Sequence, residues 1–288
     1  MAPTSRIYLT RHAQAEHNVD EDYSILDAPL TDLGKKQAQR LPLLTQDLQS
    51  IAQVVLSSPL RRTLQTTALG YPDAVKRLGG HAKVVCLPQL QECSANLCDT
   101  GSSRAELEAI PEFARFDLSH LTDDWTSKAG FYGAEPAALD ARARWIRQYL
   151  RERPEEHIVV VAHGDILRRM IGEEYPWTNA EVRLFQFDPA TVADADCPLF
   201  HVQDIAAGGR TDADLLQRGA PANSTNVLPA VATVSEDVSD VSGERIASME
   251  ARVKQIQASV QSQASELEDL DRRLAEAEVK KAALEKST

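Results

Sequence analysis

Apolar residues in the first two-thirds of the chain occur in short runs that alternate with longer segments of helical periodicity. The runs are rich in β-branched residues and predict strands at residues 7–10, 53–57, 84–87, 157–162 and 184–187. The intervening segments carry apolar residues at every third or fourth position, as amphipathic helices do. This alternation favours an α/β fold, and we expect a mostly parallel central sheet flanked by helices on both faces.

Helix-starting residues and prolines predict where three of these helices begin. One opens at Thr31, and we expect Pro42 to kink or interrupt it. A second follows Pro59, a residue that suits a first helical turn. A third covers roughly residues 136–151, with arginines on its polar face. Its apolar stripe consists of Leu139, Ala143, Ile146 and Leu150.

The pattern changes after residue 203 and divides the chain into three parts. Residues 1–203 form a globular domain, and residues 204–242, rich in small and polar residues without a usable period, predict a flexible linker. In residues 243–288 apolar positions recur at alternating spacings of three and four, which predicts a coiled-coil helix. A single amphipathic helix lying back on the domain is the alternative. The narrow apolar seam favours a homo-oligomer, and its β-branched positions favour a dimer.

Composition restricts the classes of partner and the location. A formal net charge of -12 argues against nucleic acid as a general partner. The sequence has no apolar stretch near the roughly 20 residues that a membrane span needs, so we expect no membrane partner. It also opens without a segment of the signal-peptide kind, which favours the cytoplasm. The four cysteines lack paired C-x-x-C spacing, so we expect neither a zinc site nor a disulfide framework.

Basic and imidazole side chains follow the predicted strands. Arg11 and His12 come at the end of the first strand, and Asn18 lies a few residues further on. Arg62 follows the second strand, and His163 follows the strand at 157–162. Because ligands bind at the carboxyl edge of open α/β sheets, we expect these side chains to converge there.

Four ordered blocks carry a specific resemblance. Residues 9–18, 29–38, 57–66 and 160–164 together resemble the signatures of the histidine phosphatase superfamily, which has the phosphoglycerate-mutase-like fold. The resemblance covers most of residues 6–170 and makes residues 1–203 a catalytic domain. It implies an enzyme that acts on a small phosphorylated substrate without a metal ion or another cofactor.

The resemblance also implies a role for each matching residue. His12 would attack phosphorus and form a phosphohistidine, while Arg11, Arg62 and Asn18 would bind the phosphate. His163 would donate to a phosphate oxygen, and a positive charge on its ring would help. The proton donor is expected at Glu92, which follows a predicted strand where the family often carries its acid; an exposed loop glutamate is the alternative.

Departures from the family pattern bear on the reaction. Ala13 stands where glycine is usual, and Gln14 stands where glutamate is frequent, although neither removes a catalytic group. Residues 93–104 are short and lack the arginine-rich character of mutase insertions, which favours a hydrolase acting on phosphate monoesters. Phosphoglycerate mutase-type transfer and a non-catalytic coiled-coil scaffold are the alternatives.

Other polar residues match no motif. Five histidines are expected in ordinary surface or packing roles, namely His17, His81, His120, His157 and His201. The tetrapeptide Asp99-Thr100-Gly101-Ser102 predicts a turn at the rim of the site. Trp125, Lys128 and Tyr132 fit either a lid over the site or core packing.

Overall fold

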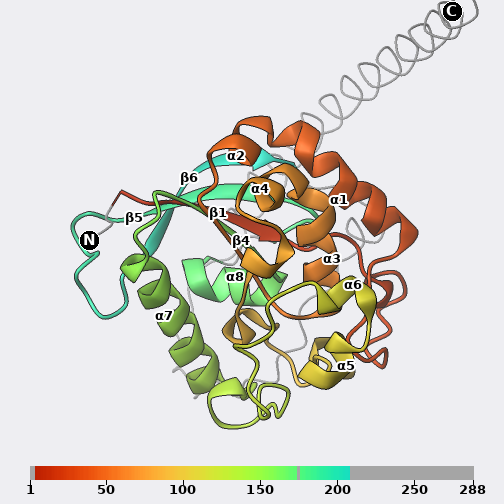
Figure 1. Ribbon diagram of the computed structural model, residues 1–288. Coiled ribbons are helices and arrows are strands. Elements are labelled where there is room, and N and C mark those ends of the chain that lie inside the picture. The colour runs from red at the N-terminus through yellow and green to blue at the C-terminus, as the bar shows by residue number, and fades with distance from the viewer. Residues whose placement is uncertain (1–3, 174–175, 208–288) are drawn as a thin grey trace, which may run out of the picture. The chain divides into compact units, whose positions relative to one another are not determined.

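The computed structural model describes residues 4–173 and 176–207, which contain all the predicted site residues (Figure 1). The chain separates into two units, residues 1–222 and residues 223–288. All described residues belong to the first unit. Most of the predicted linker and the whole predicted coiled coil lie outside the described residues.

A six-stranded mixed sheet forms the centre of the domain, with the strand order β3-β2-β4-β1-β5-β6. The strands are β1 (Arg6–Arg11), β2 (Val54–Ser57), β3 (Val85–Cys86), β4 (His157–Ala162), β5 (Val182–Phe187) and β6 (Leu199–Ala206). The first four are parallel, β5 pairs antiparallel with β1, and β6 pairs antiparallel with β5. The carboxyl ends of β1, β2 and β4 therefore meet at one edge of the sheet.

Helices surround this sheet (Figure 1). The α-helices are α1 (Asp32–Leu44), α2 (Gln46–Ile51), α3 (Arg61–Gly70), α4 (Pro72–Arg77), α5 (Arg104–Glu108), α6 (Pro111–Ala114), α7 (Pro136–Glu152) and α8 (Gly164–Ile171). Short 3-10 turns are η1 (Glu16–Asn18), η2 (His81–Lys83), η3 (Pro88–Leu90), η4 (Leu97–Asp99) and η5 (Gly130–Tyr132).

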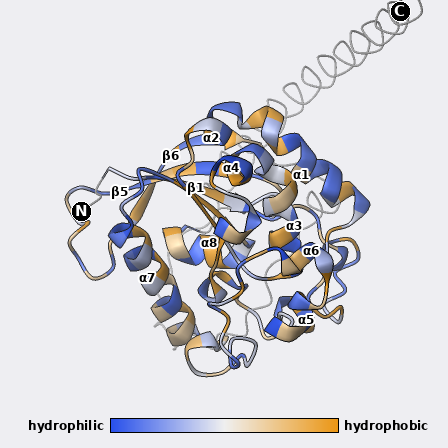
Figure 2. Cartoon of the chain, in the orientation of Figure 1, coloured by the Kyte–Doolittle hydropathy of each residue, from blue (hydrophilic) through white to orange (hydrophobic). Residues whose placement is uncertain are grey.

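Alternate residues of each central strand enter two hydrophobic cores, one on each side of the sheet. Tyr8 packs with α1 and α3 side chains on one side, whereas Ile7 and Leu9 pack with α7 and α8 side chains on the other. Figure 2 shows hydrophobic residues along the central strands and residues of both kinds on α7. The expected cover of helices on both faces is present, because strands buried on both sides need apolar partners above and below.

Four local expectations need correction. Pro42 remains inside α1, two residues before its end, so it does not interrupt that helix. Pro59 precedes the first turn of α3, because Leu60 is the N-cap residue. Arg142 is fully buried although it was assigned to the polar face of α7. Strand β6 extends to Ala206, three residues beyond the predicted domain boundary at 203.

Among the described helices, none combines the length and the hydropathy that crossing a membrane would need. All four cysteines are buried free thiols.

Candidate active site

His12 lies immediately after β1 with its ring orientation fixed. Its backbone N–H donates to the Ala162 carbonyl at 2.9 Å, and the Nδ1 atom lies 2.7 Å from the Ala13 carbonyl oxygen. Because a carbonyl oxygen can only accept, Nδ1 carries the proton and Nε2 keeps a lone pair. Burial, followed by the charge of Arg62, lowers the pKa of His12 well below its usual value. The ring is therefore neutral, and its Nε2 lone pair accepts from Arg62.

Arg62, in the first turn of α3, joins the groups of the site. Its Nε donates to His12 Nε2 at 3.3 Å and to His163 Nδ1 at 3.2 Å. Its two other nitrogens donate to the Cys98 carbonyl at 2.5 Å and to the Asp99 carboxylate at 2.9 Å. The residue is fully buried, and the ion pair with Asp99 offsets the cost of burying its charge.

His163 follows β4 and is the N-cap residue of α8. Its Nε2 lies 2.9 Å from the Ser58 hydroxyl, and its ring centroid lies 5.1 Å from that of His12. Since Nδ1 accepts from Arg62, the Nε2 atom carries the proton. Burial, followed by Arg62, lowers the pKa of His163 well below its usual value. The positive charge expected on this ring is thus disfavoured before an anion binds.

Glu92 is buried at the same edge, and the reading as an exposed loop glutamate is wrong. Its Oε2 accepts from the Asp165 N–H at 3.1 Å, while Oε1 accepts from the N–H groups of Ile166 and Cys93 at 3.0 and 2.9 Å. These bonds favour the carboxylate, but burial outweighs them and raises the pKa of Glu92 to about 7. The group can therefore hold or release a proton near neutrality.

A cavity of about 320 Å³, which we call the histidine cavity, brings the predicted residues together. Arg11, His12, Asn18 and Glu92 line it directly, and His163 and Arg62 are bonded behind it. The Arg11 guanidinium donates to the Trp177 carbonyl at the rim. The Asn18 carboxamide accepts from the Ala15 N–H at 3.0 Å, which holds the loop after β1 in place.

Sequence reasoning missed several residues of this cavity. His17 was assigned an ordinary role, yet it lines the cavity, is buried, and lies 3.0 Å from the Asn18 amide. Burial, followed by Arg62, lowers the pKa of His17 to about 3, so its ring is neutral. Asp99 does lie at a turn lining the cavity, as expected, but its bond to Arg62 and the lining residue Trp177 were not foreseen. The adjacent sequence His17-Asn18 was the available signal.

One cluster of the described part of the chain has the chemistry of a metal site. The ligand atoms of His17, Cys98 and Asp99 lie within 4.8 Å of one another. Asp99 is already paired with Arg62, whose positive charge would oppose a cation at this point. The cluster therefore fits a resident metal ion poorly.

Residues 29–38 support the loop that follows β1. The Thr31 hydroxyl, the N-cap of α1, accepts from the Gly34 N–H and donates to the Gln14 side chain at 2.8 Å. Gln37 accepts from the Gln14 N–H at 2.9 Å. A Cβ on Gly34 would lie 1.9 Å from the Gln14 carbonyl oxygen, so α1 rests directly on the loop. Ala13 is buried, with its N–H donating to Thr66.

Three residues were considered for a lid. Trp125 and Tyr132 are buried members of a hydrophobic core, which settles their role as packing. Lys128 donates to the Glu92 carbonyl at 3.4 Å, and the buried Arg142 donates to the same oxygen at 3.2 Å. Both cations thus fix the backbone of the candidate acid.

The mixed sheet of this α/β domain has two imidazoles, two guanidiniums and one buried carboxyl at its carboxyl edge. Together these groups define an anion site centred on histidine. The model of the histidine phosphatase superfamily, branch 1, matches residues 7–197. The chain belongs to this superfamily.

Two related sequences show the extent of the likeness. A protein of Schizosaccharomyces pombe named as a probable phosphatase is 31% identical over 166 residues, covering 56% of this chain and 75% of that protein. Phosphoglycerate mutase-like protein 1 of Arabidopsis thaliana is 30% identical over 194 residues, covering 56% of this chain and 68% of that protein. Together with the superfamily, these relatives support a phosphatase or phosphoglycerate mutase-like function.

Solved structures are more distant. The α-ribazole phosphatase from Shigella flexneri has 22% sequence identity and a TM-score of 0.47, covering 72% of this chain and 100% of that chain. An Entamoeba histolytica phosphoserine phosphatase mutant in complex with phosphoserine has 18% identity and a TM-score of 0.45, covering 70% and 97%.

Proposed function

We propose that this domain hydrolyses phosphate monoesters through a phosphohistidine intermediate on His12 and without a metal ion. The observation that carries the proposal is the fixed ring of His12. Its Nδ1–H is held by the Ala13 carbonyl, so the Nε2 lone pair faces the Arg62 guanidinium within the histidine cavity. A neutral nucleophile aimed at an anion-binding group is what attack on a bound phosphate requires.

Binding comes first in this mechanism. The phosphate would lie between Arg11 and Arg62, whose planar guanidiniums can each offer two donors to its oxygens. The Asn18 amide adds a neutral donor from the same wall. The two guanidiniums and the amide stabilise the negative charge on the equatorial oxygens while the phosphoryl group is transferred. A metal ion has this role in other phosphatases.

In the first chemical step, His12 Nε2 forms a bond to phosphorus and the ester P–O bond breaks. The departing alkoxide takes the proton of neutral Glu92, whose pKa of about 7 leaves it partly protonated near neutrality. The alcohol leaves, and the phosphoryl group remains on His12.

In the second step, water attacks phosphorus from the side that the alcohol vacated. The Glu92 carboxylate accepts a proton from that water, and the P–N bond to His12 breaks. Inorganic phosphate is released, and both His12 and Glu92 return to their starting states. A bound phosphate would favour protonation of His163, because the anion stabilises the positive charge on the ring that burial and Arg62 otherwise disfavour.

Residues 93–104 favour hydrolysis over mutase transfer. The arginine in this segment is Arg104, which is paired on the surface with Glu108 at 2.6 Å. A mutase must retain a phosphorylated intermediate while it reorients, and this segment offers no guanidinium directed at the cavity. Water is then the expected acceptor.

The decisive experiment measures phosphate release from p-nitrophenyl phosphate and a panel of phosphometabolites, with a chelator present. We expect His12→Ala to lower kcat/KM by at least about 10³-fold, since the nucleophile is lost. The control is His120→Ala, which removes an exposed histidine. Wild-type protein that is quenched rapidly after mixing with a substrate carrying radiolabelled phosphate should keep label on the protein. Label that is lost in acid and kept in base would identify the phosphohistidine.

Three outcomes would contradict the proposal. Turnover that survives His12→Ala would exclude His12 as the nucleophile, and turnover lost with the chelator would indicate a metal-dependent reaction. If the clean wild-type protein releases no phosphate from any ester of the panel and takes up no label, the non-catalytic scaffold becomes the better account.

A further inference from the structure

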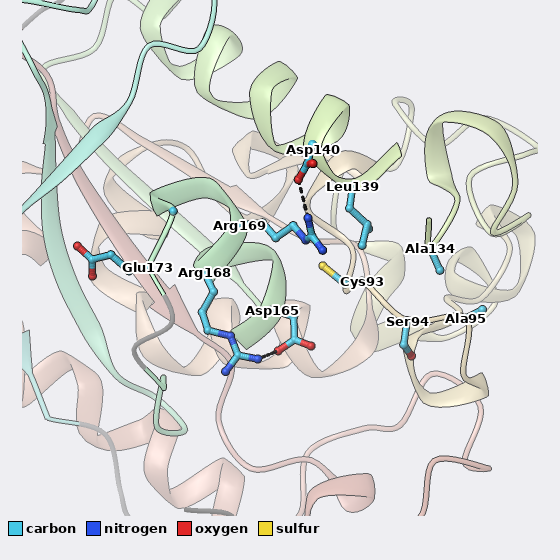
Figure 3. A pocket seen from close by; sticks show the side chains of 11 residues that line it. Cys93, Ser94, Ala95, Ala134, Leu139, Asp140, Asp165, Arg168, Arg169 and Glu173 are labelled. Carbon is cyan, nitrogen blue, oxygen red and sulfur yellow. Dashed lines mark hydrogen bonds and ion pairs between the residues drawn. The ribbon is translucent and has the colours of Figure 1, made fainter. Parts of the chain in front are cut away.

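A second and larger cavity opens beside the histidine cavity. It has a volume of about 650 Å³, and we call it the side cavity. It lies between α7 and α8, which supply Asp140 and Arg169, and the loops that carry Ala95 and Ala134 (Figure 3). Ser94, Asp165 and Arg168 line both cavities, so the two are neighbours that share one wall.

The position of Glu92 gives the direction in which a substrate extends. Glu92 lines the histidine cavity, and the next residue, Cys93, lines the side cavity. A proton donor must lie within hydrogen-bond reach of the leaving oxygen. The leaving group therefore departs on the Glu92 side of the phosphate, which is the side where the larger cavity begins.

The charges of the side cavity differ from those around His12. Arg168 is paired with Asp165, and Arg169 is paired with Asp140, as Figure 3 shows. With Glu173, the lining holds two positive and three negative side chains. Such a surface offers hydrogen bonds but gives no net attraction to a second anionic group.

Small and apolar groups leave the space between these ion pairs open. Leu139, Ala134 and the buried Cys93 thiol supply apolar surface, and the Ser94 hydroxyl adds a polar group. The volume is within the range of cavities that enclose drug-sized ligands, far more than a phosphate alone requires. A polar molecule with apolar faces matches this lining.

We propose that the side cavity receives the alcohol part of the substrate, and that the preferred substrates are monoesters of large, polar alcohols without net negative charge. Nucleosides and disaccharides have this chemistry. The inference rests on the proposed hydrolysis at His12, and it excludes compounds with a second phosphate as preferred substrates.

The test compares kcat/KM for four esters. Adenosine 5′-monophosphate and trehalose 6-phosphate have large uncharged leaving groups, glycerol 3-phosphate has a small one, and fructose 1,6-bisphosphate carries a second phosphate. We expect at least one of the large esters to exceed both of the others by about tenfold or more.

Two variants fill the side cavity. Ala134→Phe and, separately, Ala95→Phe place an aromatic ring at its walls and should lower the ratio of large-ester to small-ester kcat/KM by about tenfold. Ala109→Phe is the matched control, because Ala109 is exposed at the end of α5 and lines neither cavity. It should leave the ratio unchanged. Circular dichroism and thermal melting show that each variant is folded.

The outcomes separate the two proposals. Suppose that turnover depends on His12, but that wild-type kcat/KM is the same for large and small esters or that both filled variants keep the wild-type ratio. The proposed subsite is then wrong, and the proposed phosphatase activity stands. A preference for fructose 1,6-bisphosphate would also overturn the subsite. If turnover does not depend on His12, the proposed function itself fails.

Discussion

The histidine cavity and the side cavity share a wall but are built by opposite means. Around the first, His12, Arg62 and His163 are at most 2% exposed, and each is bound by several fixed partners. In the second, the side chain of Arg169 is 35% exposed and that of Asp140 62%, and the two are paired with each other. Burial makes the first cavity rigid and intolerant of change, whereas an exposed lining can be altered without unfolding the protein. We infer that phosphate recognition is fixed and leaving-group recognition is variable.

Of the variants that test this comparison, Arg62→Lys should give the largest effect, and it tests the rigid side. Lysine keeps the charge but cannot bind two imidazoles, a carboxylate and a carbonyl at once, as Arg62 does. We expect kcat/KM to fall by about 10²–10³-fold for all phosphate esters alike. Steady-state kinetics with a small and a large ester would show it. A loss confined to large esters would contradict the division of labour between the cavities.

Glu92→Gln should give a smaller effect that depends on the leaving group. An alkyl ester needs a proton at its leaving oxygen and should lose about 10²-fold in kcat/KM, whereas p-nitrophenyl phosphate should lose far less. Because burial raises the pKa of Glu92 to about 7, the neutral acid is present below that pH and is lost above it. Wild-type turnover of alkyl esters should therefore decrease as the pH rises through about 7.

The pH profile supplies the control for this prediction. In Glu92→Gln the decrease near pH 7 should be absent, because the amide does not titrate there. An unchanged profile in the variant would assign the titration to another group, and an equal loss for alkyl and aryl esters would remove Glu92 as the proton donor.

Removal of residues 243–288 should have the smallest effect on either cavity. This segment, the predicted coiled coil, lies outside the described residues, and both cavities are lined by residues between 11 and 177. We expect the shortened protein to become monomeric while kcat/KM changes less than about twofold. Light scattering coupled to sizing measures the mass. An unchanged mass would contradict self-association through this segment.

Residues with a repeating local environment were predictable from the sequence. The parallel strands are buried on both faces and read as continuous apolar runs, and the polar residues that follow them had to meet at one edge. The strand pattern thus predicted that His12, Arg62 and His163 would lie together, and Arg62 Nε is hydrogen-bonded to both imidazoles. The packing of Thr31 and Gln37 against the Gln14 segment also explains why residues 29–38 belong to the same pattern.

Residues whose role depends on distant contacts were not predictable. Strand β6 is largely exposed, so it lacks the apolar run that marks the central strands. Arg142 was expected on the polar face of α7, but it is buried and donates to the Glu92 carbonyl. His17 looked ordinary because Cys98 and Asp99 of η4 lie beside it, and local patterns do not contain such a contact between segments.

Gly34 shows that the loop after β1 restricts which residue can stand at a position some 20 residues further along the chain. It belongs to α1, which lines neither cavity, yet the Gln14 carbonyl occupies the space that a side chain at this position would need. In a saturation mutagenesis experiment we expect Gly34 to accept as few substitutions as His12, while its exposed neighbours Leu33 and Lys35 accept most residues. The residues that position 34 can accept are therefore limited by the backbone of the Gln14 segment. A list of residues that contact the substrate would not include this position.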